Sequence, residues 1–191
     1  LKFKQMLHFR NFNRCFCLQS FLMDRVNAIT DYIYLGGIAG VKKEFLQGSG
    51  INLIINATNE MPDYNSHGIE KIRIKIGDMP GAKIEEHFEQ VADIIEERRK
   101  QSQKVFVHCV AGVSRSSTLV LAYLMKYQQL SLVEAHDLVK SKRKVIRPNN
   151  GFWMQLIDYE NKLFGKNTVT MVPTPLGILA DVYEPEVRNM R

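Results

Sequence analysis

The chain has 191 residues, of which 45% are hydrophobic and 24% charged, as in a domain that can bury a sizeable core. Its longest apolar run, residues 119–125, is much shorter than the ~18 apolar residues of a membrane-spanning helix, so stable membrane insertion is not expected. Four of the 26 basic residues lie in the acid-free segment 1–23, so the remaining chain carries 22 basic and 20 acidic residues. This near-neutral balance argues against nucleic acid as the main partner.

The cysteine count gives a second constraint. Cys15, Cys17 and Cys109 provide neither a disulfide framework nor a four-ligand zinc site. A reducing compartment fits this pattern, and we expect a monomer in the cytoplasm or the nucleus that needs no metal and no cofactor. Residues 1–23 are interpreted as a basic N-terminal extension of unknown role, with mitochondrial or membrane-surface targeting as the alternative.

Residues 24–165 read as one domain in which expected strands alternate with expected helices. Apolar alternation and buried-type runs predict strands over 29–35, 51–57, 70–76 and 104–107. Helical periodicity and capping signals predict helices over 42–47, 84–100, 117–127, 131–140 and 152–164. The proline-rich segment 166–191 is expected to be an extended C-terminal tail. The alternation predicts an α/β fold with a central, mostly parallel sheet flanked by helices.

The segment 107–117 joins the last expected strand to an apolar helix and contains a Cys and an Arg separated by five uncharged residues. Such a loop can curl so that its backbone N–H groups converge, and the following helix adds the positive end of its dipole. A dianionic phosphate fits this environment. The expected phosphate-binding residues are Val110, Ala111, Gly112, Val113, Ser114 and Arg115.

Each side chain in this loop has a chemical reason to be there. The field that binds phosphate also favours a thiolate, so Cys109 is the candidate nucleophile. Arg115 offers a planar fork for two phosphate oxygens, and Gly112 permits a positive φ. Ser116 can donate to the Cys109 sulfur, and His108 can brace the loop through its ring nitrogens. The plain alternative is a buried cysteine followed by a helical arginine, which the full pattern disfavours.

The quoted residues resemble the small atypical dual-specificity protein phosphatases of the cysteine-dependent protein tyrosine phosphatase superfamily. The resemblance covers about residues 25–165 and extends into the tail. The matching elements are the loop 108–116, Ala122–Met125, Arg147–Asn149, Gly151–Phe152, Tyr34–Gly36, Asn56–Thr58, Phe164–Lys166 and Val172–Pro175. It implies a protein-tyrosine-phosphatase-like fold and metal-independent hydrolysis of phosphotyrosine and phosphoserine or phosphothreonine through a phosphocysteine intermediate. The implied partners are phosphoprotein substrates, with signalling kinases as candidates.

The resemblance also implies a general acid, Asp78, in the segment 76–81. Without the resemblance, the Asp-x-Pro-Gly pattern would equally indicate a turn. Asp63, Glu85 and Glu86 are weaker candidates. Asn149 is expected in a supporting role.

Several alternatives stay open at this point. A pseudophosphatase would bind phosphoproteins without turnover, and a sulfurtransferase or an RNA 5′-phosphatase would use a similar loop. The uncharged positions between Cys109 and Arg115 favour protein over phosphoinositide substrates. The basic segment 140–147 reads as a solvated loop, with attraction of acidic phosphopeptides or nuclear import as other readings. Its basic residues are Lys140, Lys142, Arg143, Lys144 and Arg147.

Overall fold

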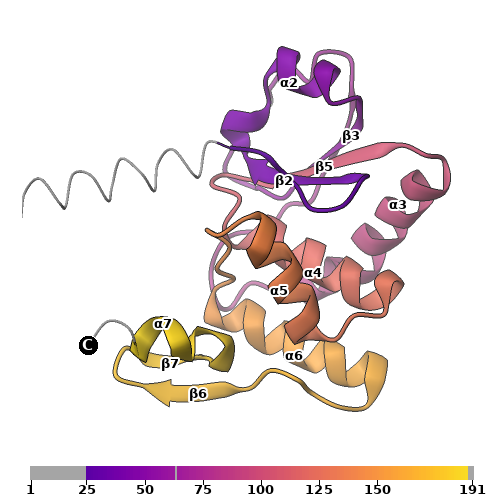
Figure 1. Ribbon diagram of the computed structural model, residues 1–191. Helices are drawn as coiled ribbons and strands as arrows, with labels where there is room; N and C mark the ends of the chain where they lie inside the picture. Colours follow the sequence, from indigo (N-terminus) through magenta and orange to yellow (C-terminus); the bar gives the residue numbers. More distant parts are fainter. Residues whose placement is uncertain (1–24, 63, 189–191) are drawn as a thin grey trace, which may run out of the picture.

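The computed structural model describes residues 25–62 and 64–188, so the expected extension 1–23 lies outside the described residues. A five-stranded sheet forms the centre, in the order β1-β2-β5-β3-β4 (Figure 1). Its strands are β1 (Asn27–Ala28), β2 (Ile33–Gly37), β3 (Ile51–Asn56), β4 (Glu70–Arg73) and β5 (Lys104–Cys109). All neighbours are parallel except β1 and β2. The predicted α/β fold with a mostly parallel sheet is confirmed.

Strand β5 lies in the middle of the sheet and is buried on both faces, as expected for a central parallel strand. Val105, Val107 and Cys109 belong to the large core beneath the main helices. Phe106 belongs to the smaller core on the opposite face, with α2 (Lys43–Gly48). The alternation of side chains along β5 therefore decides which face each residue serves.

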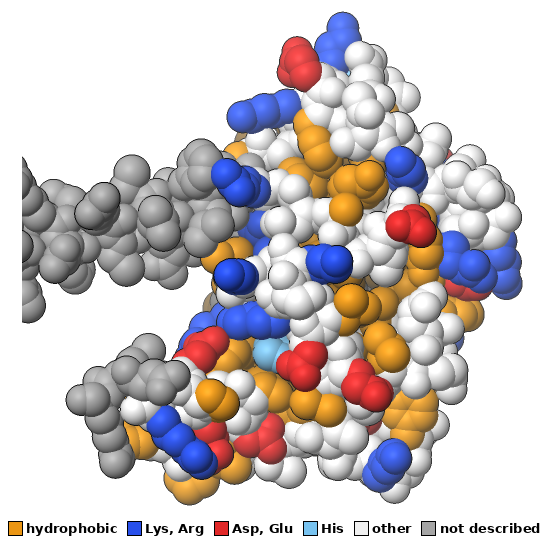
Figure 2. Space-filling view, in the orientation of Figure 1, with side chains coloured by type: hydrophobic (Ala, Val, Ile, Leu, Met, Phe, Trp, Pro, Cys, Tyr) orange, Lys and Arg blue, Asp and Glu red, His pale blue; other side chains and the backbone are white. Residues whose placement is uncertain are grey.

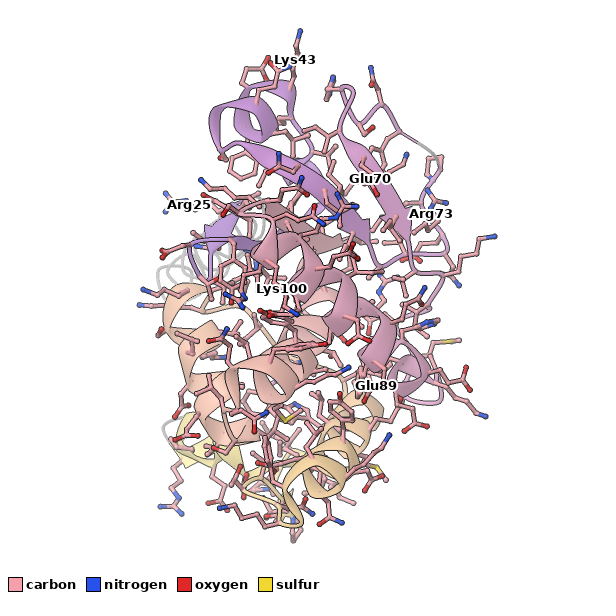
Figure 3. The ribbon with its side chains drawn as sticks, turned by 90° about the vertical axis from the view of Figure 1, so that its right-hand side faces the viewer. Arg25, Lys43, Glu70, Arg73, Glu89 and Lys100 are labelled. Atoms are coloured by element: carbon pink, nitrogen blue, oxygen red, sulfur yellow. The ribbon has the colours of Figure 1, made fainter. Side chains whose placement is uncertain are left out.

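The main helices are α3 (Phe88–Lys100), α4 (Arg115–Gln128), α5 (Leu132–Lys142) and α6 (Asn150–Phe164). Helix α4 is their centre and packs against α3, α5 and α6. Figure 3 shows Glu89 and Lys100 near the two ends of α3, and Glu70 and Arg73 on the edge strand β4. None of the helices in the described part of the chain has the length and apolar character needed to cross a bilayer.

Local capping signals place several helix ends. A full capping box formed by Ser131 and Glu134 begins α5, as its sequence spacing predicts. The Asn149 side chain accepts from the Phe152 N–H and begins α6, and Gly165, in the left-handed region, ends it. The helix expected over 84–100 begins with a 3₁₀ turn, η2 (Ile84–His87).

Two expected strands are shorter in the structure. The strand expected over 29–35 begins only at Ile33, with β2, because the Thr30 hydroxyl accepts hydrogen bonds from the backbone N–H groups of Tyr32 and Ile33 and residues 29–32 form a turn. Strand β4 ends at Arg73 rather than at residue 76. The chain then leaves the sheet edge and carries Asp78 towards the end of β5.

The C-terminal segment is folded, so the expectation of an extended tail is wrong for residues 171–188. Strands β6 (Met171–Thr174) and β7 (Gly177–Ala180) form a hairpin, followed by η3 (Asp181–Tyr183) and α7 (Glu184–Arg188) (Figure 1). Val169, Ala180 and Tyr183 are buried in the main core. The prolines do not prevent this arrangement, because a two-stranded hairpin consists of edge strands. Figure 2 shows basic and acidic side chains interspersed on this side of the molecule.

Candidate active site

The loop between β5 and α4 closes around the sulfur of Cys109. Cys109 is the last residue of β5 and is 1% exposed. The backbone N–H of Gly112 and the hydroxyl of Ser116 each donate to Sγ over 3.2 Å. Two donors directed at one sulfur suit a thiolate, which is a strong acceptor.

The backbone carbonyls of the loop point away from its centre. Each accepts a hydrogen bond from outside the loop: Cys109 from His108 Nδ1 (3.0 Å), Val110 from the Ile38 N–H (2.9 Å), Ala111 from Arg143 Nη2 (2.9 Å), Gly112 from Arg143 Nε (2.7 Å) and Val113 from the Arg147 N–H (2.8 Å). A planar trans peptide places each C=O opposite the next N–H. The N–H groups of residues 110–114 therefore face inwards and form a concave anion site.

Gly112 allows the loop to approach strand β2. Its φ is +66°, and a Cβ on it would lie 2.2 Å from the carbonyl carbon of Gly36. A Cβ on Gly37 would meet the Val110 carbonyl oxygen at 2.7 Å. Both the conformation and the close contact thus require glycine at position 112.

Arg115 begins α4, and its side chain is buried. Its two Nη atoms contact the carboxylate of Glu60 at 2.8 and 2.7 Å, and Nη1 also donates to the Ile76 carbonyl. Burial opposes the charged form, but Glu60 together with Cys109 and Asp78 outweighs burial, so the pKa of Arg115 is raised. The hydrogen bond from Arg115 in turn lowers the pKa of Glu60. Among the described residues, Arg115 Nε has no hydrogen-bond partner, and it lies 3.8 Å from Asp78 Oδ2.

Glu60 was not among the residues predicted from the sequence. It follows β3, at the edge of the sheet where the parallel strands end and where such folds place ligands. Its position shortly after a predicted strand was the one signal that could have identified Glu60. The residues next to it do not distinguish it from other acidic residues in loops.

Asp78 lies at the mouth of the loop with its side chain 37% exposed. Ser114 Oγ donates to its Oδ1 over 2.7 Å, and Asn149 Nδ2 donates to the same oxygen over 2.9 Å. The backbone N–H of Asn149 also donates to Ser114 Oγ. The structure therefore brings Asp78, Ser114 and Asn149 together at the loop that contains Ser114.

The weaker acid candidates are not in this group. Asp63 lies outside the described residues. Glu85 and Glu86 are exposed on η2, where the Glu85 N–H is bonded to the Gln155 side chain of α6.

His108 directly precedes Cys109 and is fully buried. A carbonyl can only accept, so Nδ1 carries the proton that is donated to the Cys109 carbonyl. Nε2 then accepts from the hydroxyl of Tyr64 at 2.6 Å. Burial lowers the pKa of His108 to about 4, which matches a neutral ring. Tyr64, on the loop after β3, was also missed by sequence reasoning.

Arg143 corrects the interpretation of the basic segment as a solvated loop. Its side chain is buried, and besides the Ala111 and Gly112 carbonyls it donates to the Arg25 carbonyl and to Asn27 Oδ1. Burial lowers its pKa to about 10. Lys142 and Lys144, on either side of it, are exposed. One residue of this basic segment, Arg143, is therefore buried and bonded to the loop between β5 and α4.

The other two basic residues of the segment are tied to the C-terminal elements. Lys140 and Arg147 form ion pairs with the two carboxylate oxygens of Glu186, at 3.1 and 3.0 Å. The Arg147 guanidinium also lies over the ring of Tyr183. Among residues 25–62 and 64–188, no cluster of three His, Cys, Asp or Glu side chains could hold a metal ion.

Comparison with known proteins identifies relatives of this site and fold. Residues 33–162 match the family model described as "Dual specificity phosphatase, catalytic domain". Human dual specificity protein phosphatase 14 is 50% identical over 163 residues, which cover 85% of this chain and 82% of the relative. Human dual specificity protein phosphatase 18 is 43% identical over 166 residues, covering 86% and 88%. The crystal structure of human DUSP28 is similar with a TM-score of 0.70 at 31% identity, covering 72% of this chain and 94% of that one.

Proposed function

This chain belongs to the dual-specificity protein phosphatases, which dephosphorylate tyrosine and serine or threonine in proteins, and we propose that it does so through a phosphocysteine intermediate on Cys109 without a metal ion. Phosphate would sit in the concave site formed by the N–H groups of residues 110–114, with Arg115 as the cationic clamp. Asp78 would be the general acid and base. His108, Ser116 and Asn149 would support these groups.

The first step transfers the phosphoryl group to sulfur. The Cys109 thiolate attacks phosphorus, the S–P bond forms and the P–O bond to the substrate breaks. Asp78, protonated, gives its proton to the departing oxygen. Inward N–H groups and Arg115 stabilise the charge on the three equatorial oxygens.

The second step regenerates the enzyme. Asp78, now a carboxylate, takes a proton from water, whose oxygen attacks phosphorus while the P–S bond breaks. The sulfur leaves as a thiolate, and the donors on it, Gly112 N–H and Ser116 Oγ, stabilise that charge. Inorganic phosphate is the product.

One observation carries this proposal. The loop directs five consecutive carbonyls outwards, and the buried Arg115 Nε at its rim has no hydrogen-bond partner among the described residues. Buried donors without partners are costly, so a site built this way is completed by an anionic ligand. A pseudophosphatase would satisfy the same observation, but such proteins usually lack the Cys, the Arg or the acid, and Cys109, Arg115 and Asp78 are all present in this chain.

The test is hydrolysis of p-nitrophenyl phosphate by the full chain with EDTA present. We expect turnover in the wild type, and loss of turnover with retained phosphate binding in Cys109→Ser. Arg115→Lys is also expected to be severe, because a point charge cannot replace a bidentate fork. More than about a tenth of the wild-type kcat in either variant, a loss below ~1.4 kcal/mol, would refute the assignment.

The role of Asp78 has its own signature. Asp78→Asn should slow phenyl and alkyl phosphates by about 10²–10⁴-fold and slow an activated aryl phosphate much less. An equal loss of rate for substrates with good and poor leaving groups would instead indicate that Asp78 has only a structural role in the turn.

The exposed rim, with Val110 38% exposed, suits phosphorylated side chains of different length on a protein surface. We therefore propose phosphoproteins as substrates, with signalling kinases among them. We also propose that the protein acts as a monomer in the cytoplasm or the nucleus.

A further inference from the structure

Four large apolar side chains are exposed around the start of α6. The exposed fractions are 63% for Met79, 58% for Met154, 60% for Leu176 and 60% for Ile178. They come from three parts of the chain: the segment that carries Asp78, helix α6 and the C-terminal hairpin. Since single exposed apolar residues are ordinary, the question is whether these four form one surface.

Backbone and side-chain contacts join the three parts. Pro80, next to Met79, lies directly against Gly151, where a Cβ would be 1.9 Å from the Pro80 carbonyl oxygen. Met154 is one helical turn after Gly151, and therefore lies beside it on the same side of α6.

The hairpin also reaches the start of α6. Asn150 Nδ2, one turn before Met154, donates to the Ile178 carbonyl over 2.7 Å. Leu176 lies in the turn that leads into β7. Helix α6 and β7 are in contact. We call Met79, Met154, Leu176 and Ile178 together the apolar surface.

The apolar surface borders the phosphate site. Met79 directly follows Asp78, the proposed general acid, and Asn150 directly follows Asn149, which holds Asp78. A polypeptide whose phosphorylated residue occupies the loop must place its leaving oxygen at Asp78. Its neighbouring residues then pass beside Met79.

We propose that the apolar surface binds the substrate polypeptide itself, through a large apolar side chain within a few residues of the phosphorylated position. The inference rests on the proposed function of the loop and adds a source of sequence preference to it. The concave site would contact phosphate through backbone N–H groups and one arginine. These groups recognise the phosphate and do not distinguish the substrate residues on either side of it. The flexible side chains of Met79 and Met154 can adapt to apolar side chains of varied shape.

The experiment uses the full chain and a set of phosphotyrosine peptides that differ only by Leu or Ser at one position. The position is moved from two to five residues on either side of the phosphotyrosine, a reach of roughly 7–17 Å for an extended chain. We expect Leu to raise kcat/KM about tenfold over Ser at one or two positions on one side only.

The variants Met154→Glu and Ile178→Glu should reduce that Leu-to-Ser ratio to about one. Both should leave p-nitrophenyl phosphate hydrolysis within twofold, because neither residue belongs to the phosphate site. Tyr127→Ser is the matched control: Tyr127 is 36% exposed in the last turn of α4, at the end opposite to the loop, and its loss should not change the ratio.

Three results would overturn the inference: no Leu preference at any position in the wild type, an unchanged ratio in both glutamate variants, or an equal fall in Tyr127→Ser. A wild-type dimer that both glutamate variants convert to monomer, seen by analytical ultracentrifugation, would assign the surface to a second copy of the chain instead. Failure of the proposed function looks different, because the wild type would then not hydrolyse p-nitrophenyl phosphate at all.

Discussion

Replacement of Arg143 by lysine tests whether a buried cation outside the loop holds the phosphate site in shape. Lysine keeps the positive charge, so the change isolates geometry from charge. The guanidinium reaches the carbonyls of Ala111 and Gly112 through two different nitrogens and also donates to the Arg25 carbonyl and Asn27 Oδ1. A single ammonium nitrogen cannot occupy these positions at once.

The magnitude follows from the bonds that are lost. A hydrogen bond from a charged donor contributes about 1.5–3 kcal/mol, and a buried carbonyl left unpaired costs a similar amount. Loss of two such bonds should lower the free energy of unfolding by about 3 kcal/mol or more. The carbonyls of Ala111 and Gly112 also fix the direction of the N–H groups of Gly112 and Val113. Their rotation should lower kcat by about 10–100-fold, which is less than outright removal of a donor would cause.

The assay combines urea unfolding, p-nitrophenyl phosphate kinetics and inhibition by inorganic phosphate. We expect Arg143→Lys to lower stability, kcat and phosphate affinity together. Lys144→Ala, at the exposed neighbouring position, is the control and should change none of them by more than twofold. The reasoning fails if Arg143→Lys has the same free energy of unfolding as the wild type, or a kcat within twofold of it. The orientation of the Ala111 and Gly112 carbonyls would then not depend on Arg143.

Three further predictions concern the same site. Glu60→Gln should lower kcat/KM about tenfold in steady-state assays, because the buried Arg115 loses its ionic partner. Gly112→Ala should abolish turnover and lower Tm, since its Cβ would meet Gly36, whereas Gly48→Ala, with nothing within 4 Å, should do neither. The folded-state pKa of His108, about 4, lies below the ~6.5 of an unfolded chain, so its contribution to stability is complete above pH 6.5 and is lost as the pH falls towards 4. Urea unfolding should show a loss of about 3 kcal/mol from this residue between pH 7 and pH 4 that His108→Gln does not show.

The parts of the site that are local in sequence could be predicted. The strand, the loop and the helix from 104 to 128 are consecutive, so the spacing of Cys109 and Arg115 and the glycine between them already indicate an anion site. The capping box of α5 and the left-handed Gly165 are local for the same reason. Strand 29–35 was predicted too long, because apolar alternation continues through a turn that Thr30 makes.

The parts that depend on distant contacts could not be predicted. Glu60 is 55 positions from Arg115, and Arg143 is 31 positions from Gly112, so no periodicity links them. The basic segment 140–147 looked solvated because charge runs usually are, and only packing shows that Arg143 is buried. The C-terminal hairpin has two four-residue strands with prolines in and beside one of them, which is too short for a periodic signal.

These distant contacts give a physical account of how a nearly neutral domain would bind a dianion under the proposed function. The charge of the buried Arg115 is balanced by the Glu60 carboxylate, so Arg115 does not need solvent to balance it. Arg143 lies behind the loop and is solvated by carbonyl and amide oxygens rather than by water. The inward N–H groups carry only partial charges. The field at the phosphate position therefore arises from buried and oriented groups, which salt screens far less than exposed lysines. Under this proposal, selectivity for phosphate would not depend on the charge of the protein surface, and that surface would be free to discriminate between substrates by apolar contact.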